Sequence, residues 1–310
     1  MRIAVAIALC LAPVAARAEP DPPAPARQAL DDAWWTGPML ANSAATLPRG
    51  HALIETYVYD VHGGQADSLG SLTYMLYGVT DRLTLGLKPN FGFNAMKGGR
   101  DSSGVGFGDL TVQGQYSLTR FDAARGIPAL AISLQQTLPT GRYDRLGDRP
   151  ADGIGGGAWA TTVALYAQHY FWLPNGRILR GRINVSETLS SKAPVHDVSV
   201  YGTAEGFRGS ARPGRNFYLG GSLEYSVTKR WVLGLDATWS HNGVTRVSGV
   251  GLASSPVRLA YGPSDAFALA PAVEYSWTSN LGVLLAARFI PRGHNVAPSV
   301  TPAVAINAVF

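Results

Sequence analysis

Apolar and polar residues alternate with a period of two in many segments of the chain, a pattern typical of β-strands with one buried face. From Phe217 to Val227 the odd-numbered residues are nearly all apolar, whereas the even-numbered ones include Tyr218 and Glu224. Residues 231–240 repeat this pattern, with Trp and Leu on one face and Asp and Thr on the other. The alternation therefore predicts an all-β protein.

Turn residues between these segments divide the chain into about twelve predicted strands. The expected strands lie near residues 50–60, 68–77, 82–92, 107–119, 128–138, 158–171, 177–188, 215–227, 231–241, 265–277, 281–290 and 298–310. Short connections alternate with longer ones, which we expect at 93–106, 139–157, 189–214 and 242–264, with shorter members near 60–67 and 291–297. This is the pattern of a transmembrane antiparallel β-barrel of 10–14 strands, with short periplasmic turns and longer extracellular loops.

One motif recurs at the short turns. The stretches YGVTDRLTLGL (77–87), YSVTKRWVLGL (225–235) and YSWTSNLGVLL (275–285) share a layout, and YSLTRF (116–121) repeats its first half. Aromatic rings favour the membrane–water interface, because the ring is apolar while its polar edge stays wet. The repeats therefore predict hairpin bases at one membrane face, with the interface aromatics Tyr77, Tyr116, Tyr225, Trp231, Tyr275 and Phe310. A soluble β-sandwich also alternates, but it needs neither matched aromatics nor a terminal Phe310.

The N-terminus predicts export. Arg2, an apolar run and the small residues Ala16 and Ala18 form a signal peptide over residues 1–18. Its removal takes away Cys10, the only cysteine, so disulfides cannot stabilise the mature chain. No later run of apolar residues is long enough for a spanning helix, and the modest positive charge is spread along the chain, which gives no reason to expect nucleic acid. We expect localisation in a bacterial outer membrane.

Residues 19–48 precede the barrel, which we expect over residues 49–310. Their first part, EPDPPAPARQA, is Pro-rich and predicts an extended lead-in. The second part carries Trp34, Trp35 and Met39, which are too apolar for a free periplasmic tail. Two hypotheses follow: this segment enters the barrel as a plug or gate, or it lies against the membrane interface as an anchor.

Charged residues fall on the predicted inward face of neighbouring strands. Burying charge in lipid is costly, so inward placement is expected. These residues form either a ladder of ion pairs that stiffens the barrel or a polar constriction that filters solutes. The predicted lumen-lining residues are Glu55, Lys88, Arg180, Arg182, Glu224, Asp236, Glu274 and Arg288.

Other chemistry finds little support in the sequence. The glycine-rich stretches GVGFGD (104–109) and GIGGGA (153–158) precede no predicted helix, so we interpret them as flexible ends of strands rather than phosphate sites. The six histidines lack metal-ligand spacing. No histidine has a serine two residues away on the same strand face, as a lipase dyad on one strand would require. We therefore expect no metal, no cofactor and no enzymatic activity.

The chain also resembles the transporter-like outer-membrane family named for the meta-pathway of phenol degradation. The resemblance rests on WWTGPMLANSAATLPRGHALIETYVYD (34–60), on the hairpin at 77–87 and on GFGDLTVQGQYSL (106–118). It implies a barrel that takes up aromatic compounds, and it transfers no site residue.

The sequence thus predicts a monomeric outer-membrane channel for passive uptake of small aromatic or hydrophobic solutes. The alternative is a structural or surface-interaction barrel without transport, whose long loops contact ligands outside the cell. Expected partners are outer-membrane lipid, a small-molecule solute and the barrel-assembly machinery, because the last strand ends on Phe310 as the recognition signal of such barrels does. Lipopolysaccharide is a further candidate, through the predicted loop 203–215 with Arg208, Arg212 and Arg215; the alternative, which the sequence favours, is a basic loop that is only solvated.

Overall fold

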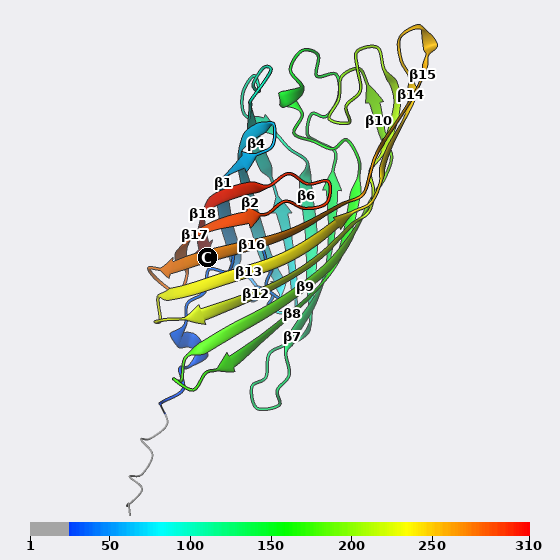
Figure 1. Cartoon of the computed structure of the whole chain (residues 1–310). Helices are drawn as coiled ribbons and strands as arrows, with labels where there is room; N and C mark the ends of the chain where they lie inside the picture. Colours follow the sequence, from blue (N-terminus) through cyan, green and yellow to red (C-terminus); the bar gives the residue numbers. More distant parts are fainter. Residues whose placement is uncertain (1–24) are drawn as a thin grey trace, which may run out of the picture.

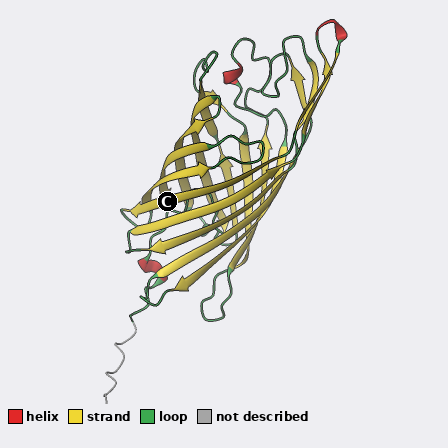
Figure 2. Ribbon diagram, in the orientation of Figure 1, coloured by secondary structure: helices red, strands yellow, loops and turns green. Residues whose placement is uncertain are grey.

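The computed structural model describes residues 25–310 (Figure 1). The predicted signal peptide, residues 1–18, and the first part of the Pro-rich segment lie outside the described residues. The remainder of the chain forms one closed antiparallel barrel, and a segment before the first strand lies at its base (Figures 1 and 2).

Twelve strands make the barrel, as the alternation predicted, and two of them are interrupted. The uninterrupted ones are β1 (Ala52–Gly63), β2 (Ala66–Thr80), β7 (Ala129–Leu138), β8 (Ala160–Trp172), β9 (Ile178–Ser190), β12 (Asn216–Ser226), β13 (Trp231–Asn242), β16 (Ser264–Ser276), β17 (Leu281–Ile290) and β18 (Ser299–Val309). The interrupted ones are β3 (Leu83–Lys88) continued by β4 (Asn90–Met96), and β5 (Gly106–Phe107) continued by β6 (Leu110–Thr119). Pro89 lacks a backbone N–H and separates β3 from β4. Pairing of β1 with both β2 and β18 closes the sheet.

The outer surface is mostly apolar along the middle of the strands. In β13, exposed and buried residues alternate from Trp231 to Trp239, with leucines pointing out and Asp236 pointing in. Large apolar side chains that are about half exposed recur around the barrel, among them Leu85, Leu134, Leu165, Leu223, Leu235 and Leu285. An apolar outer band over a polar interior is the arrangement of a barrel that crosses a bilayer. Separately, within residues 25–310 no helix is long and apolar enough to cross a membrane.

The threonine of the repeated Tyr-x-x-Thr motif stabilises the turn through its side chain. The hydroxyl of Thr80 accepts a hydrogen bond from the backbone N–H two residues later, at 3.2 Å, and the hydroxyls of Thr228 and Thr278 do the same at 3.2 Å each. Such a side-chain bond replaces a backbone turn bond and favours a tight reversal. The motif therefore marks hairpins at one end of the barrel.

At the opposite end of the barrel, regular strand structure extends further than the sequence predicted. The supposed loops 189–214 and 242–264 contain four strands, β10 (Ala193–His196), β11 (Arg208–Arg212), β14 (Thr245–Val250) and β15 (Pro256–Tyr261), which pair as a separate sheet above the barrel (Figure 1). Interruptions at Pro213–Gly214 and Gly243–Val244 shift the phase of the alternation, so the sequence pattern predicts loops there rather than strands. The expected loop near 60–67 was also wrong, because β1 and β2 are joined directly at Gly64–Gln65.

The remaining elements are three short 3-10 helices: η1 (Leu30–Asp32) before the barrel, η2 (Pro150–Asp152) in the β7–β8 loop and η3 (Leu252–Ser254) between β14 and β15. Both the segment that contains η1 and the end of β18 lie at the end of the barrel with the short turns (Figures 1 and 2).

Substituting Leu235 by Arg tests the outer band. Leu235 is mid-strand and outward-facing, so we expect Leu235→Arg to lower the free energy of unfolding from liposomes by about 2–4 kcal/mol. Guanidinium titration of folded barrel in lipid vesicles measures this. The control is Leu252→Arg, at an exposed position in η3 outside the band, which should leave stability unchanged. Equal effects of the two substitutions would mean that the surface around Leu235 is not in lipid.

Candidate functional site in the barrel lumen

Residues 33–47 run through the half of the lumen at the end with the short turns, which the sequence predicts to be the periplasmic end. The backbone N–H of Trp34 bonds to the Lys229 carbonyl oxygen in the β12–β13 turn, at 2.9 Å. From there the segment rises to the middle of the barrel, where Leu40 meets Asp236, and descends to Leu47, whose N–H bonds to the hydroxyl of Thr84 at 2.9 Å. It is a loop inserted from below, held by side chains of the wall.

Two inward carboxylates bind the backbone of the rising half. Glu274 accepts three hydrogen bonds through one oxygen, from the N–H and hydroxyl of Thr36 at 2.8 and 2.9 Å and from the N–H of Gly37 at 3.1 Å. Asp236 accepts one from the N–H of Leu40 at 2.9 Å. Gly37 has φ +108°, a conformation that glycine adopts without strain, and this lets consecutive N–H groups converge on one carboxylate.

The centre of the charged set is Glu224, which is fully buried. Arg180, directly opposite on β9, donates two hydrogen bonds to its carboxylate, one of them at 2.7 Å from Nε. Arg182 lies 3.1 Å from the same carboxylate and donates a 2.8 Å hydrogen bond to the carbonyl oxygen of Ala41 in the inserted segment. Buried charges need such partners, because desolvation would otherwise destabilise them strongly. The ion pairs therefore fix both the wall and the segment.

The three residues predicted to form a plug lie at different depths. Trp35 covers the guanidinium of Arg180, with 4.2 Å between the guanidinium carbon and the ring centre. Trp34 remains at the periplasmic rim, near the charged groups of Lys229 and Arg230. Met39 packs on the inner wall against a cluster formed by Tyr57, Ala272, Leu284 and Ala305. Trp35 and Met39 are thus inside the lumen, whereas Trp34 is at its edge.

Small side chains on the wall make room for the segment. Ala44 is completely buried and packs against Ala129, Ala131 and Ala164 of β7 and β8. Larger residues at these inward positions would fill the space that the segment occupies. The descending half is therefore held by shape as well as by hydrogen bonds.

All eight residues predicted to line the lumen face inward, but they form more than one group. Arg180, Arg182, Glu224, Glu274 and Asp236 surround the rising half of the segment, whereas the other three lie apart. Glu55 accepts a 3.3 Å hydrogen bond from Asn307, and Lys88 donates one to Gln135 at 2.7 Å and lies over the ring of Tyr74. Arg288 is half-buried on the inner face of β17.

Uncharged polar residues that the sequence did not single out complete the contacts. Asn184 exchanges two hydrogen bonds with the backbone of Asn42. Gln168 bonds the hydroxyl of Ser43, and Gln115 donates to the carbonyl oxygens of Ser43 and Ala45. Their signal was present, because each occupies an inward position of an alternating strand, but amides do not stand out as charges do.

A cavity of about 250 Å³ remains beside the segment. Its lining includes the two cations Arg180 and Arg182, the carboxyl group of Glu55 and the rings of Tyr57 and Tyr74. These tyrosines face each other edge to face at 6.1 Å. A second cavity, of about 360 Å³, lies on the periplasmic side, and Ala45 and Thr46 line both spaces.

The two glycine-rich stretches meet at the extracellular mouth. Asp109, which ends the first stretch, accepts hydrogen bonds from the N–H groups of Gly141 and Gly156 at 2.9 and 2.7 Å. The hydroxyl of Tyr201 donates to the carbonyl oxygen of Gly156. Burial and the nearby Asp109 carboxylate raise the pKa of Tyr201 to about 12, so its hydroxyl keeps its proton at neutral pH. The stretches interpreted as flexible strand ends are thus tied to each other.

Four of the six histidines lie near carboxylates, and His62 lies 3.1 and 3.8 Å from those of Asp60 and Asp67. His196 contacts Asp144, and His241 and His294 share Asp265 on β16, at 2.9 and 3.7 Å. Among residues 25–310, no group of three or more His, Cys, Asp or Glu side chains is arranged to hold a metal ion.

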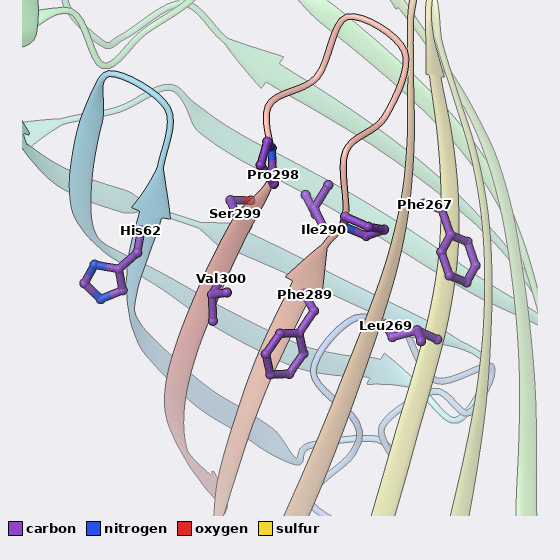
Figure 3. A pocket seen from close by; sticks show the side chains of 9 residues that line it. His62, Phe267, Leu269, Phe289, Ile290, Pro298, Ser299 and Val300 are labelled. Atoms are coloured by element: carbon purple, nitrogen blue, oxygen red, sulfur yellow. The ribbon is translucent and has the colours of Figure 1, made fainter.

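An apolar groove on the outer surface lies apart from the lumen. Phe267, Leu269, Phe289 and Val300 line it near the extracellular ends of β16, β17 and β18, with His62 at its edge (Figure 3). These are outward-facing positions of their strands, so the groove belongs to the apolar outer band.

A family model described as "Putative MetA-pathway of phenol degradation" matches residues 38–301. The structure is similar to the COG4313 outer membrane channel of Pseudomonas putida F1, with a TM-score of 0.66 and 16% identity over 88% of this chain and 100% of that one. The toluene transporters TbuX of Ralstonia pickettii and TodX of Pseudomonas putida also match, each with a TM-score of 0.40. They share 11% and 13% identity over 90% and 85% of this chain, and over 95% and 89% of theirs. A search of curated proteins found no match. At these identities the structural similarity shows the fold.

Substituting Glu224 by Gln tests the charged centre. The change leaves two buried guanidinium groups without their carboxylate, so we expect the free energy of unfolding to fall by about 3–5 kcal/mol. Denaturant titration in detergent micelles measures it. The control is Asp32→Asn, which breaks the exposed pair with Lys229 and should cost less than about 1 kcal/mol. A small effect of both substitutions would contradict the burial of Glu224.

Proposed function

The chain belongs to the family of the MetA pathway of phenol degradation, and we propose that it is an outer-membrane channel for passive entry of small aromatic or hydrophobic solutes. The observation that carries this proposal is a lumen occupied by an inserted loop with a cavity beside it, rather than by side chains of the wall alone. Passage would follow the solute gradient.

Barrel width supports a narrow passage. Eight strands enclose a space that side chains fill, whereas sixteen or more leave a water channel. Twelve strands leave an intermediate lumen, and residues 33–47 occupy its periplasmic half. Any open path would therefore depend on where this segment lies, so we assign it the role of a gate.

The size of the cavity beside the segment supports passage of solutes with about one aromatic ring. An apolar cavity of about 150 Å³ is enough for benzene, and the space beside the segment is about 250 Å³. Tyr57 and Tyr74, which line this cavity, offer ring edges and faces to a planar solute. The family's description, which names phenol degradation, agrees with this class of solute.

The way the segment is held suits a gate. Side chains of the wall bind its backbone at Thr36, Gly37 and Leu40, and these bonds can break without opening the hydrogen-bonded sheet. The closed barrel would stay intact while the loop moves. Trp35, stacked on Arg180, would leave the charged centre as the segment withdraws.

Deleting residues 31–48 tests the gate. The shortened protein should admit phenol-sized solutes into proteoliposomes about tenfold faster than the full chain, because the periplasmic half of the lumen is then open. Liposome swelling in isosmotic solute measures the rate. Impermeability of both proteins would favour the alternative, a structural or surface-interaction barrel.

A cross-link supplies the matched control. The double variant Ala44→Cys and Ala131→Cys joins the inserted segment to β7, where the two alanines pack in one cluster. Oxidised protein should be closed, and reduction of the same sample should restore the flux of the full chain. Equal flux in both states would show that residues 33–47 do not move during transport.

A further inference from the structure

Arginines gather on the outward face of the extracellular sheet. Ala211 and Val247 point inward into a buried cluster, so their strand neighbours Arg212 and Arg246 point outward. These two arginines are directly opposite each other on β11 and β14. Arg258 on β15 lies one diagonal step away, opposite Ser248. Neighbouring side chains at such positions are about 5–8 Å apart.

A third guanidinium group, that of Arg215, lies close to Arg212 and Arg246 because the strands are interrupted just below this sheet. A Cβ on Gly214 would lie 2.1 Å from the carbonyl oxygen of Gly243, so the two strands approach as only glycine allows. This phase shift lets both Arg212 and Arg215 face outward. Together with Arg246 they line a pocket of about 450 Å³ whose other residues include Glu187, Phe217 and His241.

The arginines lack ion-pair partners. Within residues 25–310, none of Arg208, Arg212, Arg215, Arg246 and Arg258 forms an ion pair. Glu187 is the single carboxylate in the pocket, and His241 is bonded to Asp265. Like charges directly across a strand pair destabilise a sheet. An anion between Arg212 and Arg246 would remove that cost.

The pocket lies just beyond the apolar band. Phe217, Trp239 and Phe267 form an outer aromatic row at this end of the barrel, with Trp239 directly opposite Phe267. Arg215 and Arg212 precede Phe217 in the chain and lie up to about 7 and 17 Å beyond it along the strand direction. A strand tilt of about 40° reduces these to heights of about 5 and 13 Å above the row. Arg215 is then at the level of the lipid headgroups, which extend about 5–7 Å beyond the hydrocarbon core, and Arg212 lies farther out.

We propose that Arg212, Arg215 and Arg246 form a binding site for the phosphate groups of an outer-leaflet phosphoglycolipid of the lipid A type. Its acyl chains would lie on the aromatic row and the apolar band beneath it, while its phosphates take paired hydrogen bonds from the guanidinium forks. The phosphates supply the missing negative charge, and the apolar surface directly below selects a lipid over a free anion.

The arginine side chains point away from the lumen, so this site is distinct from the path by which a solute would enter. The inner face of the same sheet is apolar and packs against Tyr143 and Tyr201 of the mouth loops. The arginines lie on the other face, away from the lumen, so they would not draw an anionic solute into the pore. The site is independent of the proposed channel activity.

The double variant Arg212→Gln and Arg246→Gln tests the site in the full chain. Binding of fluorescent bisphosphorylated lipid A to purified barrel in a neutral detergent should weaken about tenfold or more. The matched control is Arg120→Gln with Arg125→Gln, an equal change of charge in the exposed β6–β7 turn at the periplasmic end, and it should bind as wild type does. Solute flux through the double variant should be unchanged, which keeps this test separate from that of the channel.

Two further ligands decide between lipid and simple anion. Lipid A without phosphates should bind wild type about tenfold more weakly than the bisphosphorylated form, and should not distinguish wild type from the double variant. Inorganic phosphate at millimolar concentration should not displace the bound lipid. Unchanged binding to the double variant, equal loss in the control, or displacement by inorganic phosphate would each overturn the proposal.

Discussion

Charges inside a closed barrel are stable only when each is paired or hydrogen-bonded, and in this chain the N-terminal segment completes that pairing. Glu224 is satisfied by Arg180 and Arg182 of the wall, but Glu274 and Asp236 receive backbone N–H groups of residues 36–40. In return, Arg182 binds the carbonyl oxygen of Ala41. The segment and the charged wall therefore stabilise each other. Without the segment, Glu274 and Asp236 would lose these hydrogen-bond donors, and without the wall charges the backbone groups of the segment would be unpaired.

This mutual dependence combines two ideas that the sequence left as alternatives. A ladder of ion pairs would stiffen the barrel, and a constriction would filter solutes. The structure contains a compact ion cluster around Glu224, and the same cluster holds the loop that narrows the lumen. Stability and the proposed gating thus depend on one set of residues. The cluster is placed where β9, β12, β13 and β16 are adjacent, so alternation along each strand brings its members to one side of the wall.

Period-two alternation allowed the barrel strands, their approximate number and most of their faces to be predicted, because lipid outside and water inside impose opposite polarity on neighbouring residues. Glu224 and Asp236 were placed inward by that rule alone. The path of residues 33–47 could not be predicted, since it depends on backbone hydrogen bonds to side chains far away in sequence, such as Asn184 with Asn42. The extracellular sheet was missed for a different reason: Pro213–Gly214 and Gly243–Val244 shift the phase, so outward residues change from odd to even numbers.

The most direct test of the account is hydrogen–deuterium exchange of residues 36–47 in the full barrel, in lipid nanodiscs at neutral pH. The N–H groups of Gly37, Leu40, Asn42 and Leu47 are hydrogen-bonded to wall side chains, so the account predicts that peptides over this segment exchange much more slowly than free peptides of the same sequence. Exchange of residues 36–47 at the rate of an unstructured peptide, while the strands stay protected, would contradict it.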